Sequence, residues 1–146
     1  MPGARARGVA LLRDHELRWH KVAKDGSGKC DIVEVRSPSS LVFGVLCEIP
    51  DDEKASLDRA EGLGQGYEEK EVALELADRR VAALAYVATN IRPDILPYSW
   101  YKALVVAGAI EHGLPTDYLR VLRAVRAAQD ADAARHAKHM ALAGDA

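Results

Sequence analysis

A run of closely spaced glycines divides this chain into segments that must fold differently. Gly62, Gly64 and Gly66 fall within five residues. Glycine weakens helix interiors and is favoured where a helix ends or the chain turns sharply. We therefore expect the segment before them, which opens with the acidic first turn of a helix at 50–53, to end at Glu61. The chain should then turn into a strand.

Glu61 stands at an unfavourable place for a carboxylate. A helix C-terminus carries partial negative charge and stabilises cations rather than anions. The helix end, together with partial burial against Leu63 and Tyr67, would raise the pKa of Glu61 toward the range of a general base. From position alone, the alternative of an ordinary solvated carboxylate is favoured.

Strand patterns come first along the chain and helix patterns come last. Apolar and alternating residues predict strands at 9–12, 16–22, 41–49, 72–76 and 81–87. Helices are predicted at 98–112, ended by Gly113, and again after Thr116, which can act as the N-cap. Residues 24–29 are predicted to be a flexible loop. The predicted class is α+β, a mostly antiparallel sheet or barrel with flanking helices.

Length and charge limit the classes of protein to consider. A chain of 146 residues with 49% hydrophobic residues suits one domain with a sizeable core. We place that domain at residues 1–126, followed by an Ala-rich tail at 127–146 that is helical or partly disordered. A formal net charge of −2 argues against nucleic-acid binding. The apolar runs are too short to span a bilayer, so we expect a cytoplasmic protein without a membrane partner.

The cysteines, histidines and glycines show no metal or cofactor pattern. Cys30 and Cys47 are too far apart for a CxxC site. We expect Cys47 to be a small core residue and Cys30 a thiol in a polar loop. His136 and His139 are expected to face solvent from the tail rather than bind a metal. The glycine run has neither the Lys-Ser/Thr of a P-loop nor the dinucleotide-binding spacing.

Several motifs together resemble the γ-glutamylcyclotransferase family, that is, the AIG2-like or γ-glutamylamine cyclotransferase superfamily. They are Leu57-Asp58-Arg59-Ala60-Glu61-Gly62, Gly66-Tyr67, Tyr86, Tyr98-Ser99-Trp100-Tyr101 and Gly108-Ala109-Ile110-Glu111-His112-Gly113-Leu114-Pro115. Their order and spacing agree from Ala6 to Val125, and the combination is more specific than any one motif. The resemblance implies a mixed, mostly antiparallel β-barrel or sheet with flanking helices. It also implies an enzyme of glutathione metabolism that cyclises the γ-glutamyl group of a small peptide or amine to 5-oxoproline and releases the free amine.

The resemblance also implies roles for individual residues. Glu61 would be catalytic, and the substrate-binding residues would be Tyr101, Gly62 and Tyr67. The α-amine of the substrate attacks its own γ-carbonyl, so a base must first remove a proton from that amine. The same carboxylate can then return a proton to the departing amine. Because ring closure is intramolecular, no metal or cofactor is expected. Candidates for the pocket of the leaving amine are Trp100, Arg92 and His20.

The chain departs from the family pattern at its start. Family members begin with a strand and a Tyr-Gly-Ser-Asn loop that holds the γ-glutamyl head. This chain opens at Met1-Pro2-Gly3-Ala4-Arg5, which resembles the stretch after that loop. We therefore expect the first strand and loop to be absent, with loss of donors to the oxyanion. An internal valine codon taken as the start would explain this opening, and upstream in-frame codons for Tyr-Gly-Ser-Asn would then exist.

Different functions follow from these observations. The first is a γ-glutamylcyclotransferase that acts on a small γ-glutamyl substrate through Glu61. The second is a catalytically impaired or inactive member of the fold that binds small molecules or partners. A third is an amine lyase that acts on γ-glutamylated intermediates of a biosynthetic pathway. An unpaired strand edge near the N-terminus would favour a homodimer.

Overall fold

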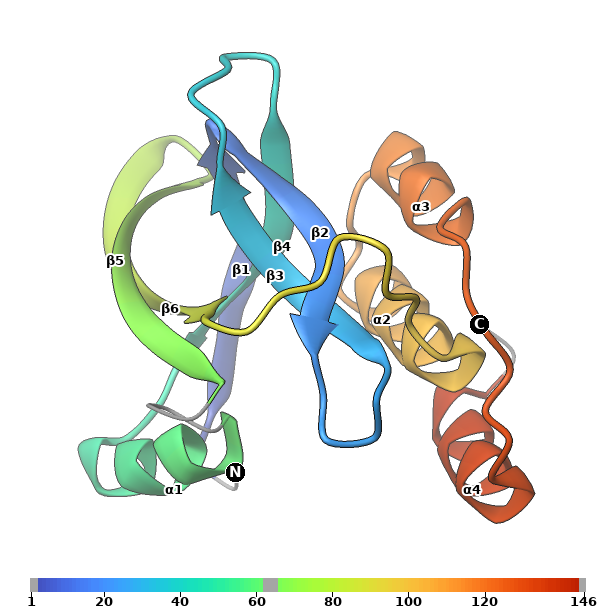
Figure 1. The fold of residues 1–146 in the computed structure, drawn as a ribbon. Helices are drawn as coiled ribbons and strands as arrows, with labels where there is room; N and C mark the ends of the chain where they lie inside the picture. Colours follow the sequence, from blue (N-terminus) through green and yellow to red (C-terminus); the bar gives the residue numbers. More distant parts are fainter. Residues whose placement is uncertain (1–2, 62–65, 145–146) are drawn as a thin grey trace.

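The computed structural model describes residues 3–61 and 66–144, with the backbone alone for residues 60 and 61. Strands come first in these ranges and helices dominate the last third (Figure 1). The elements, in chain order, are β1 (Arg5–Arg13), β2 (His15–Val22), β3 (Gly28–Glu34), β4 (Leu41–Glu48), α1 (Asp51–Glu61), β5 (Tyr67–Leu76), β6 (Arg79–Ala88), α2 (Ser99–Glu111), α3 (Thr116–Arg123) and α4 (Ala133–Ala143).

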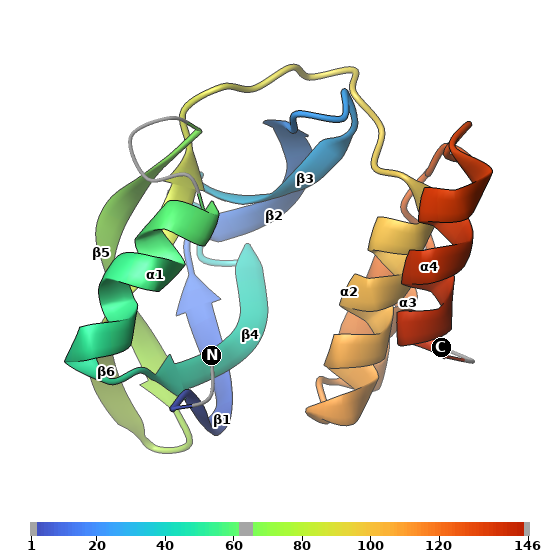
Figure 2. The same ribbon diagram turned by 90° about the horizontal axis from the view of Figure 1, so that it is seen from below.

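The strands form two antiparallel sheets. The larger has the order β4-β1-β5-β6, and β2 pairs with β3 in the smaller one. In Figure 2 the β2–β3 pair lies beside the larger sheet, and the pair and β4 both face the helices. The predicted α+β class and antiparallel sheet are confirmed. The barrel alternative is wrong for the described residues, because their strands remain divided between two open sheets.

Helices α2, α3 and α4 form a layer beside the sheets, and α1 lies across one end of the larger sheet, away from these helices (Figures 1 and 2). Helix α2 packs on both α3 and α4. Its buried residues Val106 and Ala109 join Leu122 of α3 in one apolar cluster, against which Phe43 and Val45 of β4 pack. This burial of apolar area joins the helical layer to the sheet layer.

A second apolar cluster lies within the strands. It contains Leu12 of β1, Val42 of β4 and Val72 of β5. Val72 and Leu76 are both buried, as the alternating pattern of the β5–β6 hairpin predicted. One face of this hairpin therefore faces the interior.

The helix ends follow local sequence in most places. The first turn of α1 is acidic, and the Glu53 carboxylate accepts a bond of 3.1 Å from the backbone N–H of Gly3. Helix α2 ends at the position predicted from Gly113, which has a φ of 72° just after the C-cap His112. The prediction that Thr116 caps α3 is wrong. Pro115 occupies the N-cap position, and it makes no side-chain cap bond.

The sequence patterns missed β3. This strand begins at Gly28, inside the predicted loop, and places Cys30 in a sheet. Distant partners hold it, because the Asp31 carboxylate accepts a bond of 2.8 Å from the backbone N–H of Ala88 and lies 2.7 Å from Nε2 of His20. The local sequence pattern of residues 28–34 gives no information on contacts with residues so distant in sequence.

The core position predicted for Cys47 is also wrong. Cys47 is exposed, since it lies near the end of β4 opposite Ala6, where both strands reach the margin of the sheet. The apolar run at 41–49 therefore continues past the part of β4 that is buried.

In the segment after residue 126, predicted to be helical or disordered, Ala133–Ala143 form α4, which packs on α2. The indole Nε1 of Trp100 donates to the Asp130 carboxylate at 2.9 Å, and Arg135 donates to the same carboxylate at 2.5 and 2.7 Å. The ring of His139 stacks on Trp100 with centroids 4.0 Å apart. The expectation that His139 faces solvent is therefore wrong, while a domain boundary at 126 remains a prediction. Within the described ranges, every helix is too short or too polar to cross a membrane.

Candidate functional site

Two tyrosines expected to bind substrate meet at one residue of β3. Tyr67, at the start of β5, donates from its hydroxyl to the backbone carbonyl of Cys30 at 3.1 Å. Tyr101, in the first turn of α2, accepts a bond of 3.1 Å from the backbone N–H of Cys30. Three separate elements thus bring together side chains that are far apart in sequence.

A third tyrosine extends this group toward α1. The rings of Tyr86 and Tyr67 are in edge contact, with centroids 6.4 Å apart. The Tyr86 hydroxyl donates to the carboxylate of Asp58, which also pairs with Lys54 one turn earlier on α1. These bonds fix the C-terminal half of α1 beside the tyrosines.

Glu61 is the last residue of α1, three positions after Asp58. Its side chain and the whole of Gly62 lie outside the described residues, so their predicted roles remain predictions. The chain is described again from Gly66, whose carbonyl accepts a bond of 3.0 Å from the backbone N–H of Thr89. The two ends of the glycine-rich segment are therefore both anchored on the side of the larger sheet that carries Tyr67.

Two lysines that sequence patterns did not single out face these tyrosines. Lys21 of β2 and Lys29 of β3 are paired directly across the smaller sheet. The ammonium of Lys21 lies 4.7 Å from the ring centroid of Tyr67. That of Lys29 lies 4.2 Å from the centroid of Tyr101 and 4.3 Å from that of Trp100. Their pairing could not be seen in the sequence, because β3 itself was not predicted.

Burial controls the protonation of the groups around Cys30. It raises the pKa of the Cys30 thiol to about 11, and the neighbouring Tyr101 hydroxyl and Lys29 only partly oppose this. The ring of Tyr101 packs edge-on against Trp19, with centroids 5.9 Å apart. Burial also raises the pKa of Tyr101 above its ordinary value. Both groups therefore carry their protons at neutral pH. Cys30 is a poor nucleophile there, whereas Tyr101 is a neutral hydrogen-bonding group.

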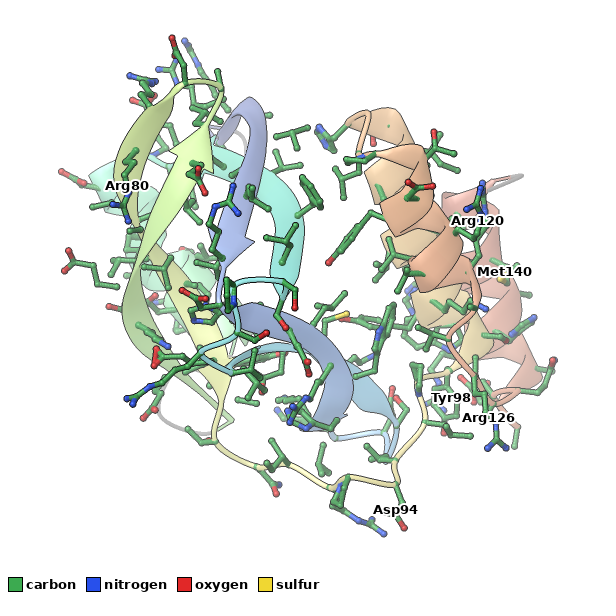
Figure 3. All side chains as sticks on the ribbon, turned by 90° about the horizontal axis from the view of Figure 1, so that it is seen from above. Arg80, Asp94, Tyr98, Arg120, Arg126 and Met140 are labelled. Carbon is green, nitrogen blue, oxygen red and sulfur yellow. The ribbon has the colours of Figure 1, made fainter. Side chains whose placement is uncertain are left out.

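The turn between β2 and β3 is fastened to the start of α2. Tyr98, labelled in Figure 3 where the linker enters this helix, donates from its hydroxyl to the carbonyl of Asp25 at 3.3 Å. The Asp25 carboxylate lies 3.8 Å from the ammonium of Lys29 and accepts bonds from Ser27. Asp25 thus links Lys29 on the smaller sheet to Tyr98 at the start of α2, and this link helps to hold Lys29 over Tyr101.

Two of the three residues proposed for the leaving-amine pocket have internal partners. Trp100 is buried and bonded to Asp130, and His20 is buried and paired with Asp31. Arg92 is exposed, and its backbone N–H donates to the carbonyl of His20. Of the three, Arg92 alone presents its side chain to solvent.

An apolar cavity of about 340 Å³ adjoins Tyr101 between the β2–β3 and β4 strands and the helices. Its lining includes Cys30, Phe43, Val105, Tyr118 and Leu122. This volume is in the range of small-molecule pockets. Within the described residues, no three His, Cys, Asp or Glu side chains gather as a metal site would require.

The fold and the tyrosine group define an α+β protein built like the γ-glutamyl cyclotransferases. A solved structure named γ-glutamyl cyclotransferase superposes with a TM-score of 0.85 at 25% identity, and the match covers 97% of this chain and 87% of that one. The family model described as "AIG2-like family" matches residues 41–122, which is more than half of the chain. The chain therefore belongs to the AIG2-like family.

Relatives of known name agree with this membership. The γ-glutamylcyclotransferase of Bos taurus is 29% identical over 137 residues, which cover 85% of this chain and 68% of the relative. The γ-glutamylcyclotransferase of Homo sapiens is 32% identical over 123 residues, with coverage of 80% and 64%. The matched region thus spans about two thirds of the length of these relatives.

Proposed function

We propose that this protein is a γ-glutamylcyclotransferase. It would convert the γ-glutamyl group of a small peptide or amine to 5-oxoproline and release the free amine, in the cytoplasm and within glutathione metabolism. The observation that supports this best is the meeting of Tyr67 and Tyr101 at Cys30, beside the end of the helix that carries Glu61. The membership in the AIG2-like family adds independent support.

The reaction requires a proton to move twice. The α-amine of the substrate is protonated at neutral pH, so Glu61 first takes a proton and frees the nitrogen lone pair. That nitrogen attacks the γ-carbonyl carbon of the same molecule, and a C–N bond forms to close a five-membered ring. In the tetrahedral intermediate the ring nitrogen loses its second proton to solvent. When the intermediate collapses, the bond to the leaving nitrogen breaks, Glu61 returns the first proton to that nitrogen, and the released amine takes up another from solvent.

The protein's larger contribution is to hold the substrate in a folded conformer. Intramolecular attack gains most of its rate from orientation of the two reacting groups. Tyr101 is protonated and fixed by Cys30, so it is suited to hold an oxygen atom of the substrate without moving. Preorganised donors of this kind stabilise developing charge because they need not reorient during the reaction.

The assay that tests the proposal detects 5-oxoproline. The protein is incubated with γ-glutamyl-alanine and other γ-glutamyl dipeptides, beside a Glu61→Gln variant. We expect release by the parent and a loss of at least about a hundredfold in kcat for the variant, the usual scale for removal of an acid/base group. Equal activity of parent and variant would contradict the role of Glu61. A folded parent without activity would favour the binding-only member of the fold.

A further inference from the structure

The cross-strand pair of Lys21 and Lys29 is unusual in a small sheet. Like charges directly opposite each other in antiparallel strands are destabilising, since their Cβ atoms are about 4.5–5.5 Å apart. Both side chains are half-buried, which weakens the screening of their repulsion by water. Such a pair is expected where two positive charges are needed together for a ligand.

Few of the described acidic side chains lie where they could neutralise this pair. Among the described side chains, the ion pair recorded for Lys29 is with Asp25, at 3.8 Å, and none is recorded for Lys21. Asp25 is already shared with the N–H and hydroxyl of Ser27. Burial lowers the pKa of Lys29, Asp25 opposes this, and Lys21 reinforces it. An anionic ligand would relieve the repulsion.

Both ammonium groups are directed at the tyrosine group rather than at open solvent. Each lies over the ring of a tyrosine whose hydroxyl is bonded to Cys30, Lys21 over Tyr67 and Lys29 over Tyr101. A Cβ placed on Gly66 would come within 3.2 Å of Nζ of Lys21, so a side chain at that position would crowd the ammonium. Each ammonium is thus held over a tyrosine ring of the same group.

We propose that Lys21 and Lys29 bind the α-carboxylate of the γ-glutamyl head, and so determine specificity for substrates that carry this group. This inference rests on the proposed function. The α-carboxylate takes no part in ring closure and keeps its charge in 5-oxoproline, so cations can hold it throughout the reaction. It shares a carbon atom with the attacking amine, and its anchoring therefore fixes the amine relative to the γ-carbonyl.

The test compares two substrates that differ in this carboxylate alone. γ-Glutamyl-alanine carries it, whereas γ-aminobutyryl-alanine lacks it and closes to pyrrolidinone with release of alanine. We expect Lys21→Met and Lys29→Met to lower kcat/KM for the first substrate by about 10- to 100-fold, the scale of a lost bond to a charged group. Turnover of the second should change by less than about twofold, because it has no carboxylate to lose.

Controls separate binding from folding. Lys24→Met removes an exposed lysine of the same turn and should leave both substrates unaffected. Lys29→Arg keeps the charge and the contact with the rings, and should retain most of the preference. Thermal unfolding of every variant shows whether it is folded. Equal losses for both substrates in folded Lys21→Met and Lys29→Met would overturn the inference.

If neither the parent protein nor any variant turns over a substrate, a binding measurement is used instead. That result would contradict the proposed function, and NMR titration with 5-oxoproline and with pyrrolidinone would then test the lysines alone. Binding of 5-oxoproline that weakens about 10-fold or more in the two variants, with no such effect on pyrrolidinone, would support the carboxylate site. Absent or unchanged binding of 5-oxoproline would overturn it.

Discussion

At the scale of single residues, Cys30 is the point on which the candidate site is assembled. Its carbonyl and N–H bind the hydroxyls of Tyr67 and Tyr101, while its thiol lies in a buried setting. The backbone of this residue is thus used for structure, and its side chain is kept protonated. A nucleophilic role for Cys30 is inconsistent with this environment.

The two thiols should therefore react at different rates. At neutral pH we expect iodoacetamide to modify the exposed Cys47 quickly and Cys30 slowly, because the thiolate is the reactive form. In a Cys47→Ser variant, the remaining rate should rise about tenfold per pH unit up to the pKa of about 11. Mass spectrometry of the modified chain measures both rates. A Cys30 that reacts as fast as free cysteine at neutral pH would contradict its burial.

At the scale of elements, α4 fixes the start of α2, where Tyr101 lies. Asp130 receives bonds from Trp100 on α2 and from Arg135 on α4. Trp100 directly precedes Tyr101, and the rings of these two residues are in edge contact. The position of the tyrosine therefore depends on a helix at the other end of the sequence.

This attachment predicts a pH dependence of stability. Hydrogen bonding from Arg135 is the main cause that holds the pKa of Asp130 below its ordinary value in the folded protein. The contribution to stability is therefore present above the unfolded pKa of about 4 and is lost as the pH falls below it. We expect Asp130→Asn to lower Tm at pH 7 and to reduce the loss of Tm between about pH 5 and pH 2.

Asp117→Asn is the matched control, because Asp117 is exposed and pairs with Arg120 on the surface of α3. Its Tm profile against pH should follow that of the parent protein. If Asp130→Asn and Asp117→Asn gave the same profile, the buried attachment of α4 would contribute nothing measurable.

Elements whose ends are set by local residues could be predicted, and those held by distant contacts could not. The glycine at 113 marked the end of α2, and alternation marked the β5–β6 hairpin. Strand β3 was not predicted, because it is held by bonds of Asp31 to residues on β6 and β2 that are distant in sequence. In the candidate site, resemblance predicted Tyr67 and Tyr101, whose roles remain predictions, whereas the proposal for Lys21 and Lys29 required the register of β3.

At the scale of the whole molecule, β6 is an edge of the larger sheet within the described residues. It is ten residues long, and Leu84 on it is 57% exposed. Long apolar edges are templates for pairing with another chain. The homodimer expected from the sequence thus remains a prediction, and this edge is the surface we assign to it.

Light scattering after size-exclusion chromatography tests that prediction. We expect a dimer whose population rises with protein concentration, and a shift toward monomer for Leu84→Lys, since a charge on an edge opposes pairing. Leu142→Lys is the matched control, because Leu142 is 71% exposed on α4 and distant in the fold from β6. A parent that stays monomeric at high concentration, or an equal effect of both substitutions, would refute pairing through β6.

If the proposed function is right, the substrate's own amine, and not water, attacks the γ-carbonyl. The most direct measurement is the mass spectrum of the acid formed from γ-glutamyl-alanine in water enriched in the heavy oxygen isotope. We predict 5-oxoproline without heavy oxygen, in amounts equal to the alanine released, because ring closure adds no atom from water. Glutamate that carries one heavy oxygen atom would show hydrolysis instead and would contradict the account.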